Sequence, residues 1–173
     1  MRHDNPSEAV PVRMTAPGQP RPHPDMLDPV SRHLLPVLRY FLSALQSPDG
    51  QSWRFAYSAA AEIWGEARGL AVAHRTQNFL SALLKSRPVP LRHADPLCLE
   101  ARAELTEDEC LLMALLTRMR ADETAQARDM LAALTGGRIA AAAVRTGLEL
   151  SAVLDAPSGK RRGRQAPVLR AVT

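Results

Sequence analysis

The sequence predicts an all-α fold, a compact bundle of about five to six helices between two tails that we expect to be disordered. Leucine and alanine dominate its 173 residues, β-branched residues are sparse, and aromatic residues make up only 4%. This composition favours helix over sheet. Several segments repeat apolar residues at the helical period, and the chain is long enough to bury a core without disulfides.

The expected organisation is a helical domain at residues 29–156 with an arm at each end. Residues 1–28 hold six prolines among polar and charged residues, a composition that cannot bury enough apolar surface to offset ordering entropy. We therefore expect a disordered N-terminal arm, and a disordered basic tail at 157–173. A proline-containing connector separates two segments of the domain, 29–87 and 104–156, and leaves open whether they share one core.

The first helix is expected to begin at Asp28-Pro29, where an acid can cap the N-terminus and proline suits the first turn. Pro36 lies inside its apolar stripe, so this helix is either kinked there or begins anew. The sequence Ser47-Pro48-Asp49-Gly50 then predicts a tight turn.

Ser52 is placed to cap a second helix. Two glycines, Gly65 and Gly69, interrupt the following stripe, and its phase changes after them. We expect a bend or break near Gly69 and a third helix that ends at about Ser86. The connector from Arg87 onward contains three prolines and little periodicity, which indicates irregular structure.

The clearest boundary is the capping box of Thr106 and Glu109, which predicts the start of a fourth helix. A fifth helix is expected at 123–134, with Gly136 and Gly137 as its C-cap. The sixth, expected at 138–154, carries alanine on several faces, which indicates that it is deeply buried.

The net positive charge is concentrated in the tail. Residues 157–173 contain no acid and five basic residues, Lys160, Arg161, Arg162, Arg164 and Arg170. Residues 30–156 contain 14 basic and 14 acidic residues, so the domain itself is neutral. The tail predicts affinity for a polyanion such as nucleic acid, although a solvated terminus is an equally good interpretation.

No motif indicates catalysis, a metal or a cofactor. His93, Cys98 and Cys110 match no metal-ligand spacing, so the two thiols are expected to be packed side chains. Glycines before Arg138 at a helix start form a generic anion site, but the phosphate-loop lysine is missing. We therefore expect a protein that is not an enzyme.

Two elements suggest nucleic-acid contact. The third helix carries Arg75, Gln77, Asn78 and Lys85, side chains that can contact base edges or phosphates, although a solvated polar face is the favoured interpretation. The helix pair at 123–154, joined by two glycines, resembles a helix-turn-helix in outline.

The function expected from these observations is that of a non-enzymatic regulatory or adaptor protein, which binds a protein partner through its helical bundle. The alternative is a DNA-binding transcriptional regulator that uses the 74–85 face or the 123–154 helix pair. Arginine-rich, alanine-rich composition is a hint of bacterial origin. The longest apolar run is short and the N-terminus lacks a signal peptide's apolar centre, so we expect a cytoplasmic protein without membrane insertion. The sequence leaves the oligomeric state open.

Overall fold

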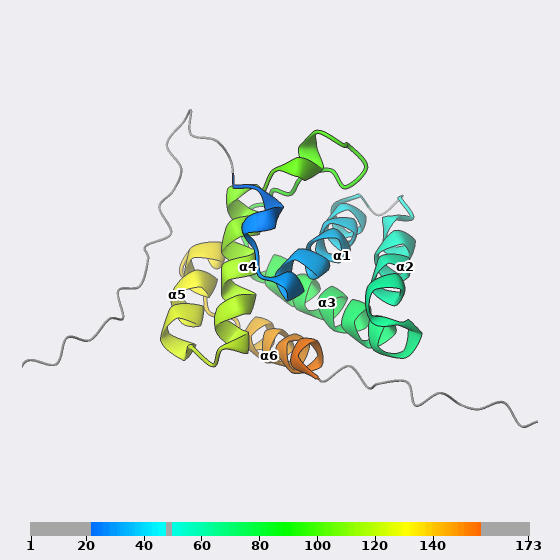
Figure 1. Cartoon of the computed structure of the whole chain (residues 1–173). Coiled ribbons are helices and arrows are strands. Elements are labelled where there is room, and N and C mark those ends of the chain that lie inside the picture. The colour runs from blue at the N-terminus through cyan, green and yellow to red at the C-terminus, as the bar shows by residue number, and fades with distance from the viewer. Residues whose placement is uncertain (1–21, 48–49, 157–173) are drawn as a thin grey trace, which may run out of the picture.

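The computed structural model describes residues 22–47 and 50–156, and every regular element within them is helical, as predicted (Figure 1). Six α-helices and two short 3-10 helices follow one another. Their bounds are η1 Pro24–Met26, α1 Pro29–Gln46, α2 Ser52–Trp64, α3 Glu66–Ser86, η2 Ala101–Ala103, α4 Glu107–Arg120, α5 Thr124–Thr135 and α6 Ala141–Asp155.

One continuous core joins the segments on either side of the connector. Its buried side chains come from all six α-helices and include Phe41 of α1, Phe79 of α3 and Leu112 of α4. The long helix α3 packs on α1, α2 and α6, while α4 contacts α1, α5 and α6. In Figure 1, α3 runs through the middle of the bundle with α6 alongside it. Along the described chain, no helix combines the length and the hydropathy needed to cross a membrane.

The domain begins before the predicted boundary at residue 29. Residues 24–26 form η1, and the Leu105 N–H donates to the Pro22 oxygen at 2.9 Å, so this stretch is attached to the residues just before α4. Asp28 caps α1 as predicted, accepting from the N–H groups of Val30 and Ser31. The helix α1 continues through Pro36 without a new start. The remaining arm residues, 1–21, lie outside the described part of the chain.

The corner between α2 and α3 lies at Gly65, so the predicted break near Gly69 is wrong. Gly65 has a φ of 78°, a left-handed conformation that favours glycine. Gly69 is helical and buried, and a Cβ there would lie 2.4 Å from the Ala60 oxygen. Gly69 therefore allows the close approach of α2 and α3. Ser52 is the first residue of α2 and makes no capping hydrogen bond, contrary to prediction.

Two predicted helix caps in the C-terminal half are confirmed. The Thr106 hydroxyl accepts from the Glu109 N–H at 3.1 Å, while the Thr106 N–H donates to the Glu109 carboxylate at 2.8 Å. Gly136 takes the left-handed conformation that ends α5.

The helix α6 differs from its prediction in two ways. It begins at Ala141, three residues later than expected, because residues 138–140 form an extended link from α5. Only one face of α6 is buried, and Leu148 remains 49% exposed. Its alanines therefore lie on both the buried and the exposed faces, and the predicted deep burial of the whole helix is wrong.

A buried ion pair holds the connector against the bundle. The Arg39 guanidinium on α1 donates to both carboxylate oxygens of Glu109 on α4, at 2.7 and 3.0 Å. The same guanidinium donates to the carbonyl oxygens of Arg102 and Glu104 at the end of the connector. Both charged side chains are at most 4% exposed. The carboxylate of Glu109 also accepts from the Ala94 N–H, so the pair connects three parts of the chain.

Candidate functional site

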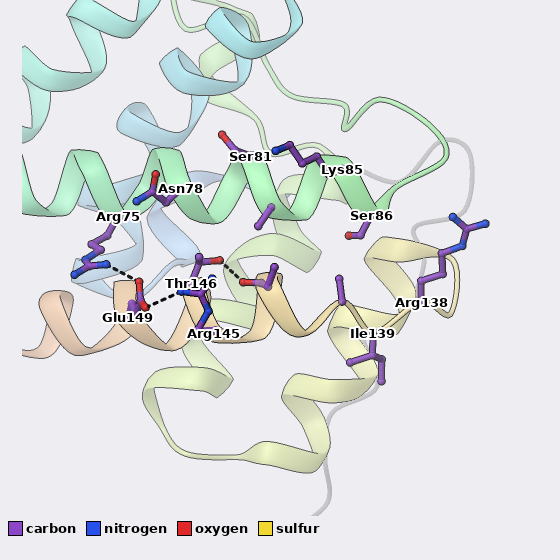
Figure 2. Close-up of a pocket in the computed structure, with 13 residues that line it drawn as sticks. Arg75, Asn78, Ser81, Lys85, Ser86, Arg138, Ile139, Arg145, Thr146 and Glu149 are labelled. Atoms are coloured by element: carbon purple, nitrogen blue, oxygen red, sulfur yellow. Dashed lines mark hydrogen bonds and ion pairs between the residues drawn. The ribbon is translucent and has the colours of Figure 1, made fainter.

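An open groove of about 680 Å³ lies between α3 and the link-α6 segment. Figure 2 shows the two elements running side by side in opposite directions, with Arg75 opposite Glu149 and Lys85 toward the end where Arg138 lies. The wall from α3 consists of Arg75, Asn78, Ser81, Ala82, Lys85 and Ser86. The other wall consists of Arg138, Ile139, Ala140, Ala142, Arg145, Thr146 and Glu149.

The helical period places the polar wall of α3 beside its buried face. Val72, Thr76, Phe79, Leu80 and Leu83 point into the core. Each wall residue lies three or four positions from another one, so together they form a neighbouring stripe on the same helix. The groove is thus a consequence of how α6 packs along one side of α3.

The charge of the groove is strongly positive although the domain is neutral. Four cationic side chains line it, Arg75, Lys85, Arg138 and Arg145, against a single acid, Glu149. Low-dielectric walls around like charges raise the local concentration of counter-ions. The groove therefore attracts anionic groups.

At one end of the groove, which we call the closed end, an acid offsets part of the positive charge. There Glu149 accepts from Arg75 at 2.5 Å and from Arg145 at 3.5 Å (Figure 2). The side chain of Glu149 is 32% exposed, so solvent screens the pair only in part. Glu149 consequently engages one guanidinium nitrogen of each arginine that faces it.

The other end, which we call the open end, keeps its charge. Lys85 and Arg138 line it, and within the described residues neither makes an ion pair. Ile139, 43% exposed, and the alanines Ala82, Ala140 and Ala142 give the groove an apolar part. This combination suits a ligand with one anionic group beside an apolar one.

The structure brings three of the predicted contact residues to this groove: Arg75, Asn78 and Lys85. Two of these already have intramolecular partners, since Arg75 pairs with Glu149 and Asn78 lies 3.1 Å from the His74 ring nitrogen. Gln77 is not in the groove and accepts from the Tyr57 hydroxyl at 3.1 Å. The predicted tail contacts Lys160, Arg161, Arg162 and Arg164 lie outside the described residues.

Sequence reasoning did not find the open groove itself. It considered Arg138 as part of a generic anion site at a helix start and did not connect this residue with the polar face of the third helix. The helix α5 packs on α4, whereas α6 packs mainly on α3, and residues 136–140 separate the two helices. This arrangement differs from a helix-turn-helix, in which a turn of about three to four residues joins the two helices.

The residues considered for a metal site are spread around the connector and α4. His93 lies 2.9 Å from the Ser43 hydroxyl, and burial lowers its pKa below the usual value. Cys98 is exposed, and burial raises the pKa of the half-buried Cys110 thiol, as do the neighbouring carboxylates. Among the described residues, no three His, Cys, Asp or Glu side chains form a group that could hold a metal ion.

The chain matches no protein-family model, and comparisons with curated proteins and with solved structures found no significant similarity.

Proposed function

We propose that this protein is a non-enzymatic adaptor that binds an acidic segment of a partner protein in the groove between α3 and α6. The observation that carries the proposal is the excess of cations in the groove, four against one acid, inside a domain whose charges balance as a whole. Complementary charge supports both partner selection and fast association.

The apolar part of the groove favours a protein segment over a bare anion. Ile139 and three alanines line the space between the charged side chains. A peptide can place an apolar side chain on this surface and a carboxylate near Lys85 and Arg138. Burying even part of Ile139 adds hydrophobic stabilisation that an inorganic ion would not gain.

Nucleic-acid binding is the second candidate, favoured by the five basic residues of the tail and the four cations of the groove. A side chain can read a base edge only when its hydrogen-bond donors and acceptors are not already engaged within the protein. Arg75, Gln77 and Asn78 each have a hydrogen-bonding neighbour within the protein. The groove therefore favours a charge-based contact over base-specific readout.

Titration of the full-length protein with poly-L-glutamate tests the proposal. The double variant Lys85→Ala/Arg138→Ala removes both cations of the open end and should weaken binding about tenfold, the effect of two partly exposed ion pairs. The matched control Arg54→Ala/Arg128→Ala removes two exposed arginines that do not line the groove. The control should keep the wild-type affinity within about twofold.

Equal weakening in the two double variants would show that only net charge matters and would contradict the proposal. Parallel titrations with single-stranded and double-stranded DNA across salt concentrations test the second candidate. If DNA binds much more tightly than poly-L-glutamate and depends on Lys85 and Arg138, the nucleic-acid function replaces the adaptor function.

A further inference from the structure

We infer that Glu149 sets the register of an acidic segment in the groove, so that an acid at the open end contributes to affinity and a second acid at the closed end adds almost nothing. This inference rests on the proposed function, because it assigns the partner's register within the same groove. It follows from the difference between the closed end, where Glu149 holds two arginines, and the open end, where Lys85 and Arg138 have no such acid.

At the closed end, Glu149 occupies the place that a partner carboxylate would take. Its two oxygens accept separately, one from Arg75 and the other from Arg145. A second carboxylate near these arginines would have to displace Glu149 or lie beside its negative charge. Either event costs free energy, since like charges repel and a partly buried carboxylate would lose its donors. A partner acid therefore gains less at this end than at the open end.

At the open end, the same partner acid meets no competing carboxylate. Among the described residues, Glu149 is the only acid that lines the groove, and it lies opposite Arg75 (Figure 2). The side chains of Ser81, Ser86 and Thr146 supply further polar groups along the walls. The acid of the segment should therefore lie near Lys85 and Arg138, with its apolar residues extending toward Asn78.

The separation of the two ends sets the length of the segment. Arg75 and Lys85 are ten residues apart on one helix, which corresponds to about 15 Å along the axis at 1.5 Å per residue. An extended chain covers that distance in about five residues at roughly 3.3 Å each. Peptides with acids five positions apart can therefore reach both ends at once.

Three blocked hexapeptides serve as probes. ELALAQ and QLALAE each carry one glutamate, at opposite ends, and ELALAE carries both. Each is titrated into the full-length wild-type protein and into Glu149→Gln, with binding followed by backbone amide chemical shifts. In the wild type, ELALAE should bind within about twofold of the better single-acid peptide. In Glu149→Gln it should bind about three- to fivefold more tightly than that peptide.

The triple variant Arg75→Gln/Arg145→Gln/Glu149→Gln shows whether the gain comes from the closed end. It should return ELALAE to the affinity of the single-acid peptide, because both arginines that would hold the second acid are missing. A preserved amide spectrum in each variant excludes misfolding as the cause of a change.

Two results would overturn the inference while leaving the proposed function intact. One is that ELALAE binds the wild type severalfold more tightly than the better single-acid peptide does. The other is an ELALAE affinity that Glu149→Gln leaves unchanged. If none of the peptides binds either protein, and poly-L-glutamate binding is also insensitive to Lys85 and Arg138, the proposed function and the inference fail together.

Discussion

The buried pair of Arg39 and Glu109 and the basic groove show two opposite uses of charge in one small helical protein. Arg39 has every partner it needs within the chain, two carboxylate oxygens and two carbonyl oxygens, and is almost inaccessible to solvent. In the groove, Lys85 and Arg138 face solvent beside an apolar surface and make no ion pair among the described residues.

The difference separates structural charge from charge that is available for binding. A buried charge must be paired, because leaving it without a partner costs several kcal/mol. An exposed charge contributes little to folding stability and can be kept for a ligand. Substitutions in the two regions should therefore affect different measurements, stability in one case and binding in the other.

The largest expected effect on stability is that of Arg39→Ala. Removing the guanidinium leaves the Glu109 carboxylate buried without its charged partner, which should lower the free energy of unfolding by about 3–5 kcal/mol. Urea denaturation followed by circular dichroism measures this change. A loss below about 1 kcal/mol would mean that the pair behaves like a surface pair and would remove the contrast with the groove.

An intermediate case is Arg120, which bridges Asp28 at the start of α1 and Asp155 at the end of α6 at 3.2 and 2.8 Å. Partial burial alone would raise the pKa of Asp28, but hydrogen bonds from Ser31 and the contact with Arg120 outweigh it and lower the pKa below 3.8. The folded state therefore favours the ionised carboxylate. The ionised Asp28 therefore stabilises the fold above the pKa that this carboxyl group has in the unfolded chain. This stabilisation is lost as the pH falls through its pKa in the folded state.

The substitution Asp28→Asn tests this pH dependence. The wild type should lose more stability than the variant between about pH 5 and about pH 3, because only the wild type must protonate this carboxylate. Urea midpoints of the two proteins across that range give the comparison. Parallel curves would show that Asp28 makes no net contribution through its ionisation.

The smallest expected effect on stability is that of Lys85→Ala/Arg138→Ala. Neither side chain makes an ion pair within the described residues, so the free energy of unfolding should change by less than about 0.5 kcal/mol. The same urea experiment measures it. A loss comparable to that of Arg39→Ala would assign these cations to the fold and would weaken the case for a binding groove.

Local signals in the sequence predicted much of the fold. The cap at Asp28, the capping box of Thr106 and Glu109 and the C-cap at Gly136 each depend on residues within a few positions of one another. Such short-range hydrogen bonds can be recognised without knowledge of the tertiary structure.

The errors concern features that only tertiary packing decides. Both Gly65 and Gly69 can end a helix, and only the close crossing of α2 and α3 shows which of them does. Similarly, Arg75 and Glu149 are 74 residues apart, and their pairing depends on how α6 packs along α3. The sequence predicted three of the groove residues as polar positions of a helix. It could not predict that the link and α6 would each add a cation beside them, Arg138 and Arg145.

The most direct test of a binding groove maps the contact itself. Backbone amide chemical shifts of the full-length protein, recorded during titration with the blocked peptide ELALAQ, should change most in the second half of α3 and at residues 138–149. Small or absent changes are expected around Arg39 and Glu109. Changes confined to residues 157–173, or centred on a surface away from α3 and α6, would contradict the account.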